Sequence, residues 1–155
     1  MAKFTHIRGD KVQMVDISGK GEVAREAVAE GRIRLREATL RAIREGTLVK
    51  GNVLATARVA AILAVKETPR IIPLCHPIPL SGIDVDFEAG EGFIRATVRV
   101  HSRGPTGVEM EALTGVSVAL LTVWDMVKSA EKDEAGQYPE TEIDGIRVLE
   151  KRKGD

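Results

Sequence analysis

The stretch Ile83-Asp84-Val85-Asp86-Phe87-Glu88, followed by Ala89-Gly90-Glu91-Gly92 and by Phe93 to His101, decides the fold class. Apolar and polar residues alternate on both sides of the glycine-containing turn, which is the pattern of strands with one buried face. Two such strands joined by a short turn form an antiparallel hairpin. The sequence therefore predicts an antiparallel sheet that needs other elements to cover one of its faces.

Two segments before this hairpin have the spacing of helices that would provide the cover. Arg36 to Glu45 has helical spacing and ends at Gly46, a residue that commonly terminates helices. A second helix is expected to begin at Asn52, a favourable N-cap, and to run to about Glu67. Pro69 lies just beyond its expected end.

A third helix is expected between Val108 and Lys132, and its part from Leu113 to Val127 is apolar on almost every side. The low-charge run Ala112 to Val127 is short for a membrane span and contains Asp125, so we interpret it as a buried helix. A helix that is apolar all round is normally buried all round. We therefore expect one face to cover the sheet and another to meet a second subunit.

The remaining segments complete a single domain over residues 1–155. Part of Gly21 to Leu35 is expected to be a strand, although Glu22 to Glu30 also permits a helix. Ile143 to Leu149 is expected to be the last strand, and residues 1–12 are interpreted as a loose arm. This mixture predicts an α+β fold, an antiparallel sheet with helices packed on one face.

Composition limits the classes of partner. Lys and Arg together number 23 and so do Asp and Glu, and aromatic residues make up 3%, which gives no reason to expect nucleic acid. A single cysteine cannot form an internal disulfide, and no signal peptide is apparent, so we expect a cytoplasmic protein that binds no membrane. No Cys/His spacing indicates a structural zinc site.

The apolar, proline-rich stretch Leu74 to Leu80 contains the only cysteine, Cys75, and beside it His76. Prolines before and after this pair exclude a helix and favour an extended segment that presents His76 in a fixed direction. A rigid apolar segment with one titratable group often holds a catalytic or binding residue. The alternative is a buried connector whose histidine bonds a backbone carbonyl.

Charged residues mark three further candidates. Asp125 is expected to be buried in the third helix with Lys128 at neighbour spacing, either as a simple ion pair or as a coupled acid/base pair with shifted pKa values. Glu109 and Glu111 form a carboxylate cluster, which would also interact favourably with a helix N-terminus. Lys50 precedes Gly51 and the N-cap Asn52, an arrangement that suits a phosphate or is simply a solvated loop lysine.

Distance separates two of these candidates. If Glu111 to Asp125 is one helix, their Cα atoms lie about 21 Å apart at a rise of roughly 1.5 Å per residue. One small substrate cannot easily touch both in the same chain. We therefore expect a homo-oligomer with its sites at an interface.

Taken together, five stretches of the chain resemble a known family. They are Met14 to Ser18, Lys50 to Arg58, Ile72 to Pro77, Thr106 to Thr114 and Asp125 to Lys128. In this order, within about residues 12 to 150, they resemble the cyclic pyranopterin monophosphate synthases, the second enzymes of molybdenum cofactor biosynthesis.

The resemblance implies a ferredoxin-like fold and a homohexamer built as a trimer of dimers, with sites at the dimer interface. It implies a lyase that converts (8S)-3',8-cyclo-7,8-dihydroguanosine 5'-triphosphate, a cyclic dihydro-GTP, to cyclic pyranopterin monophosphate and diphosphate. No resident cofactor or metal is implied, and whether a divalent metal accompanies the triphosphate is left open.

The resemblance also carries the family's functional residues onto this chain. The catalytic positions are Lys50, Asp125 and Lys128. The substrate-binding positions are Leu74, Cys75, His76, Glu109, Met110 and Glu111, with Arg25 and Lys20 as secondary candidates beside His76 for the triphosphate. The implied chemistry opens a purine-derived ring and re-closes it as a pterin, which needs positioned acids and bases, and then expels diphosphate, which needs cations.

The chain departs from the family pattern in two places. Gly104-Pro105-Thr106-Gly107 stands where the family often has Gly-Lys-Thr-Gly, and the chain ends Lys151-Arg152-Lys153-Gly154-Asp155 without a Ser-Gly-rich tail. The main alternative is a non-catalytic nucleotide- or pterin-binding module of the same fold, since fold does not fix function. A second is a purely structural oligomeric partner.

Overall fold

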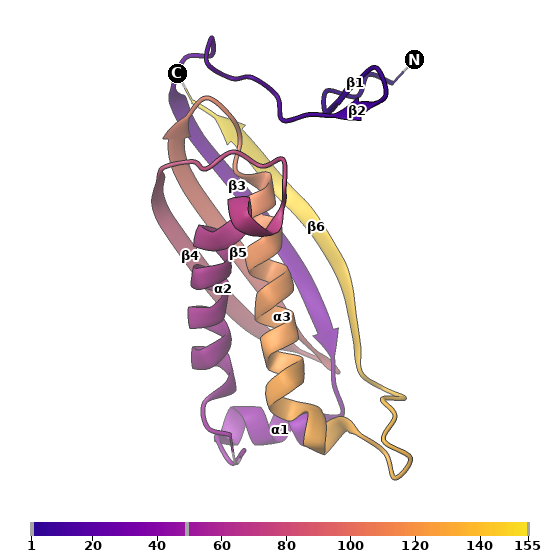
Figure 1. The fold of residues 1–155 in the computed structure, drawn as a ribbon. Helices are drawn as coiled ribbons and strands as arrows, with labels where there is room; N and C mark the ends of the chain where they lie inside the picture. The colour runs from indigo at the N-terminus through magenta and orange to yellow at the C-terminus, as the bar shows by residue number, and fades with distance from the viewer. Residues whose placement is uncertain (1, 49, 155) are drawn as a thin grey trace.

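A four-stranded antiparallel sheet in the order β4-β5-β3-β6 forms one layer of the computed structural model, which describes residues 2–48 and 50–154 (Figure 1). Its strands are β3 (Val23–Arg34), β4 (Leu80–Gly90), β5 (Phe93–Gly104) and β6 (Glu142–Lys153). Met1 and Asp155, the ends of the predicted arm and domain, lie outside the described residues. Throughout the sheet, neighbouring strands run antiparallel, as the alternating sequence pattern predicts.

Three helices make up the second layer among the described residues, and they cover one face of the sheet (Figure 1). They are α1 (Glu37–Glu45), α2 (Val53–Ile71) and α3 (Glu109–Glu131). The element order and the strand order are those of a ferredoxin-like α+β fold, which confirms the predicted class. In Figure 1, α2 and α3 lie side by side along the sheet, and α1 crosses at one end.

The hairpin that decides the fold class is β4 and β5. Gly90 pairs with Phe93, so only Glu91 and Gly92 form the turn, and Gly92 has a φ of 81°, a conformation that favours glycine. The helical alternative for Glu22 to Glu30 is wrong. That segment lies in β3, which is paired with β5 on one side and β6 on the other.

Helix α1 ends at Gly46, as predicted, and Gly46 has the left-handed conformation that is common at such ends. Helix α2 begins after Asn52, whose side chain accepts a hydrogen bond from the Ala55 amide at 2.9 Å. Its predicted end at Glu67 is wrong, because the helix runs through Pro69 to Ile71. A proline in the last turn removes one backbone donor there without interrupting the rest of the helix.

The prediction of a loose arm over residues 1–12 is partly wrong. A small hairpin forms there from β1 (Ile7–Arg8) and β2 (Lys11–Val12), joined through Gly9, which has a φ of 66°. The Gln13 amide donates to the His6 carbonyl at 2.8 Å. In Figure 1 this hairpin lies apart from the sheet and helices, at the end of an extended connection to β3.

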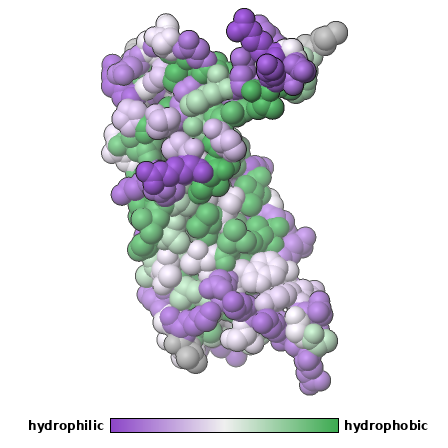
Figure 2. Space-filling view, viewed as in Figure 1, coloured by the Kyte–Doolittle hydropathy of each residue, from purple (hydrophilic) through white to green (hydrophobic). Residues whose placement is uncertain are grey.

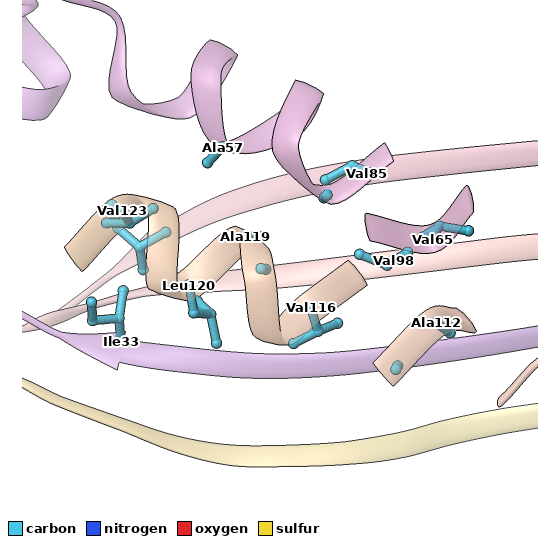
Figure 3. Close-up of a cluster of buried hydrophobic side chains, with 14 of the residues drawn as sticks. Ile33, Ala57, Val65, Val85, Val98, Ala112, Val116, Ala119, Leu120 and Val123 are labelled. Atoms are coloured by element: carbon cyan, nitrogen blue, oxygen red, sulfur yellow. The ribbon is translucent and has the colours of Figure 1, made fainter. Parts of the chain in front are cut away.

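Helix α3 is long and apolar enough, by length and composition, to cross a membrane. In this fold it packs against the sheet and against α2, with Val116, Leu120 and Val123 fully buried (Figure 3). Leu121 and Asp125 are exposed in the single chain, so α3 is not buried on every side there, and the second subunit expected against this face stays a prediction. One face of α3 therefore lies open in the single chain.

Two glycines allow α3 to approach its neighbours closely. A Cβ on Gly31 of β3 would lie 2.8 Å from Val116 and 2.9 Å from Leu120, both on α3. A Cβ on Gly115 of α3 would lie 2.7 Å from the Val65 side chain of α2. Both distances are too short for a side chain to fit without movement, so the contact depends on these two small residues.

A buried carboxylate fastens the C-terminal end of α3. Glu131 accepts hydrogen bonds from the Arg36 amide at 3.2 Å, from the Thr141 hydroxyl at 2.8 Å and from the Thr39 hydroxyl. These donors lie at the start of α1 and at the approach to β6, so one side chain joins three elements. The bonds replace the water that burial removes from the carboxylate.

The Gly31→Ala variant is expected to unfold with a free energy lower by about 1–3 kcal/mol, because overpacking displaces the α3 side chains. Urea unfolding of the purified variant measures this change. Gly19→Ala is the control, since no atom lies within 4 Å of a Cβ at that position. Equal unfolding midpoints for Gly31→Ala and the wild type would contradict the close approach of α3 to β3.

Candidate active site

The predicted site residues gather at the two ends of α3. Glu109, Met110 and Glu111 lie in its first turn, and Asp125 and Lys128 lie near its last turns. At each end, these residues contact residues from other parts of the chain, so the structure contains two partial sites.

A recess of about 640 Å³ opens beside the N-terminal end of α3. Three segments and the β1–β2 hairpin contribute its lining. The lining residues are His6, Val12, Ile72, Pro73, Leu74, Cys75, His76, Thr106, Gly107, Glu109 and Met110. Five predicted substrate-binding residues are thus brought together, and a mostly apolar recess with a few polar groups is typical of small-molecule sites.

The proline-rich segment between α2 and β4 forms one wall of this recess. It begins with a turn closed by the Cys75 amide, which donates to the Ile72 carbonyl at 3.1 Å. Leu74 lies in this turn, so the expectation of an extended segment is wrong there, and Cys75 to Pro79 form neither helix nor strand. The prolines remove backbone donors, so neither α2 nor β4 extends into this wall.

Below the recess, Cys75 contacts Glu111. The Cys75 thiol donates to Glu111 Oε2 at 3.7 Å, and the Glu111 residue is only 3% exposed. Burial raises the pKa of the Glu111 carboxyl. Burial and the neighbouring Glu111 charge raise the pKa of the Cys75 thiol to about 11. At neutral pH Cys75 is therefore a thiol and not a nucleophile, and Glu111 holds a proton more readily than an exposed glutamate.

Glu109 borders the same recess with a different partner. Its carboxylate lies against Gly107, where a side chain on residue 107 would collide with it. The Lys151 ammonium of β6 lies 3.4 Å from Glu109 Oε1. Glu109 and Glu111 are both in the first turn of α3, as the helix-dipole interpretation requires, and their role in a site stays a prediction.

The two secondary candidates for phosphate contact lie outside the recess lining. Arg25 donates to the Gly104 carbonyl at 3.4 Å and to the Pro105 carbonyl at 3.2 Å, which holds β3 to the segment that leads into Thr106. Lys20 is exposed in the connection between the β1–β2 hairpin and β3. Among the described residues, neither Arg25 nor Lys20 makes a hydrogen bond or salt bridge to another predicted site residue.

At the other end of α3, Asp125 joins Lys50 and Lys128. The Lys128 ammonium donates to Asp125 Oδ1 at 2.7 Å, and the Lys50 ammonium donates to the Asp125 backbone carbonyl at 3.1 Å. Lys50 also lies 3.8 Å from Asp125 Oδ2. The structure therefore unites the three predicted catalytic residues, although Lys50 precedes them by more than seventy positions.

The expected burial of Asp125 is wrong, because its side chain is 63% exposed. The pKa shifts of Asp125 and Lys128 are therefore not caused mainly by burial. The hydrogen bond between the two side chains lowers the pKa of Asp125 and raises the pKa of Lys128. In the single chain this is an exposed ion pair, so Lys128 starts as a cation and Asp125 as an anion.

Sequence reasoning missed several neighbours of these residues. Trp124 packs edge-to-face on Tyr138 with ring centroids 5.1 Å apart, beside the Lys128 side chain. The sequence gives no indication that Trp124 and Tyr138 meet, because Tyr138 lies in the polar loop between α3 and β6. His6 and Val12 were missed for a similar reason, since the N-terminal segment shows no period.

The two partial sites cannot serve one small substrate within one chain. Helix α3 is continuous from Glu109 to Glu131, so the predicted separation of Glu111 and Asp125, about 21 Å at 1.5 Å per residue, applies. Within residues 2–48 and 50–154, no three His, Cys, Asp or Glu side chains converge as a metal site requires.

The raised pKa of Cys75 predicts slow alkylation. With a pKa of about 11, roughly one thiol in a thousand is ionised at pH 8, and the iodoacetamide rate should rise steadily with pH toward 11. Glu111→Gln removes the neighbouring charge, so it should lower the pKa and speed alkylation at pH 9. Glu88→Gln, on an exposed strand position, is the matched control. A wild-type rate that levels off near pH 8 would contradict this environment.

Comparisons with known proteins identify the family of this chain. A model of the MoaC family matches residues 14–154. A probable cyclic pyranopterin monophosphate synthase of Methanoregula boonei is 73% identical over 154 residues, which cover 99% of each chain. Proteins with the same name from Methanosphaerula palustris and Pyrococcus abyssi are 70% and 61% identical over 99% of this chain, covering 100% and 96% of their own. The chain belongs to the MoaC family.

Proposed function

We propose that the protein is a cyclic pyranopterin monophosphate synthase, a lyase of molybdenum cofactor biosynthesis. It converts (8S)-3',8-cyclo-7,8-dihydroguanosine 5'-triphosphate to cyclic pyranopterin monophosphate and diphosphate. The observation that carries the proposal is the presence of two partial sites at the two ends of α3. One is a recess with Glu111 buried beside its Cys75, and the other is the cluster of Asp125 and Lys128 with Lys50 from the segment before α2. Relatives up to 73% identical carry the name of this enzyme.

The recess suits the ring system of that substrate. Glu111 is buried with a raised pKa, so it can accept or donate a hydrogen bond at the ring edge, and Cys75 keeps its proton beside it. Leu74 and Met110 supply apolar contact. His76, with Arg25 and Lys20 as secondary candidates, faces the triphosphate as it leaves the recess.

The lysine–aspartate cluster suits the acid/base and phosphate steps. Lys128 is a cation at neutral pH, so it can donate a proton to a ring nitrogen or oxygen and stabilise negative charge at phosphorus. The ribose-derived hydroxyl then attacks the α-phosphate. A new O–P bond forms, the bond to the diphosphate breaks, and the hydroxyl proton passes to a base such as Asp125. Lys50 adds a second cation or acid.

The reaction rearranges atoms without net oxidation, so the proposal needs no redox cofactor. It includes no resident metal, and a divalent ion would enter only as a companion of the substrate's triphosphate. The location that we propose is the cytoplasm.

The proposed assembly is a homohexamer built as a trimer of dimers, in which one subunit's recess receives the Lys50–Asp125–Lys128 cluster of another. The separation of the two partial sites along α3 supports it. So does an exposed apolar stripe on α2 and α3, where Val59, Leu63 and Leu121 are 57–58% exposed. Figure 2 shows hydrophobic residues over this helical face. Such a surface in a small chain favours contact with a second copy.

The alternative, a non-catalytic nucleotide- or pterin-binding module, also fits the fold. It explains the recess and Glu111. It does not require Asp125 to hold two lysines at the far end of α3.

The Lys128→Ala variant should lose at least about 100-fold in the rate of diphosphate release from the cyclic dihydro-GTP, because general-acid contributions are of this size. Lys132→Ala, an exposed lysine just past the end of α3, is the matched control and should keep the wild-type rate. Release by Lys128→Ala at the wild-type rate would remove the proposed role. No release by the wild type, with tight substrate binding, would favour the binding module.

Leu63→Glu should dissociate the assembly, because it places a charge in the apolar stripe. Light scattering of the wild type should give six times the mass of one chain, and the variant a smaller species. Arg41→Glu, at an exposed position of α1, is the control and should leave the mass unchanged. A wild type that is a fully active monomer would overturn the shared-site proposal.

A further inference from the structure

The β1–β2 hairpin supplies one wall of the recess. His6 and Val12 border it from the hairpin, and His76 and Glu109 border it from the body of the protein. None of the five sequence stretches that resemble the family includes this hairpin. Its contribution to the recess comes from the structure alone.

Hydrogen bonds that hold the hairpin are local. His6 Nδ1 lies 3.2 Å from the Gln13 carbonyl oxygen, and the Gln13 amide donates to the His6 carbonyl at 2.8 Å. Val12 is 72% exposed although it borders the recess. An apolar side chain left this exposed at the edge of a recess gains contact area when a ligand occupies the space beside it.

The contact with Gln13 fixes the tautomer of His6. A carbonyl oxygen only accepts, so Nδ1 carries the proton and Nε2 of the neutral ring presents a lone pair. In the tautomer that makes this bond, Nε2 of His6 can accept a hydrogen bond from a ligand in the recess. The Glu109 carboxylate, which also borders the recess, is another acceptor. Such walls suit a ligand with ring N–H donors better than they suit a phosphate.

We propose that His6 is a substrate-binding residue. Its Nε2 accepts a hydrogen bond from an N–H group of a purine-derived or pterin-like ring, and Val12 packs on the face of that ring. The inference rests on the proposed function and adds the hairpin to the site. His6 binds the substrate and takes no part in the proton transfers assigned to Lys128 and Asp125.

Two substitutions of His6 test its ring atoms Nδ1 and Nε2 individually. His6→Asn keeps a donor near the position of Nδ1 for the Gln13 carbonyl and removes Nε2. His6→Gln places a polar atom near the position of Nε2. Lys11→Ala changes an exposed hairpin residue that does not border the recess, and serves as the control.

The measurement is the Kd of the cyclic dihydro-GTP by anaerobic calorimetry, with each change made in the Lys128→Ala background so that no turnover occurs. His6→Asn should raise Kd about 5- to 10-fold, the usual value of one hydrogen bond. His6→Gln and Lys11→Ala should stay within about twofold of the parent. In the otherwise wild-type enzyme, His6→Asn should raise KM and leave kcat unchanged, the pattern of lost uniform binding.

Unchanged Kd and KM in His6→Asn, with normal diphosphate release by the wild type, would overturn this inference and leave the proposed function standing. A fall in kcat with no change in KM or Kd would also overturn it, because His6 would then act in turnover and not in binding. A wild type that neither binds nor converts the cyclic dihydro-GTP would overturn the proposed function, and the role of His6 with it.

Discussion

The close contact of α3 with the sheet is the constraint on which the rest of the structure depends. Gly31 leaves room for Val116 and Leu120, and Gly115 leaves room for Val65, so the helix lies against β3 and α2 along its length. Glu131 then fastens its C-terminal end to α1 and to the approach to β6. Because α3 is packed in this way and carries residues of both partial sites, its position determines where both sites lie.

The two ends of α3 offer complementary environments. At the N-terminal end the carboxyl of Glu111 is buried and the thiol of Cys75 is half-buried, and burial is the main cause of their raised pKa values. At the C-terminal end Lys128 and Asp125 are exposed, and their pKa values shift because they pair with each other. The N-terminal end therefore provides a partly buried binding environment, and the C-terminal end provides lysines that can act as acids. Joining them across two subunits would combine both, and would desolvate the ion pair that water screens in the single chain.

Much of the fold was predictable because alternation and helical spacing directly reflect which face is buried. Ile83, Val85 and Phe87 gave β4, and the Asn52 cap gave the start of α2. The exposure of Asp125 was not predictable in this way, since an apolar helix can lie at a subunit interface as well as in a core. The hairpin containing His6 has no periodic signal, and the Lys50–Asp125 contact joins distant segments whose meeting depends on tertiary packing. The site residues themselves were found chiefly through the family resemblance, and the structure showed which of them meet.

The most direct test of the account mixes two inactive variants, Glu111→Ala and Lys128→Ala, after reversible dissociation, and measures diphosphate release from the cyclic dihydro-GTP. If each site takes its recess from one subunit and its lysine cluster from another, mixed dimers contain one intact site, and random mixing should restore about a quarter of the wild-type rate. Activity that stays at the level of the separate variants, in assemblies shown by mass to contain both chains, would contradict a shared site. The two ends of α3 would then have to act within one chain.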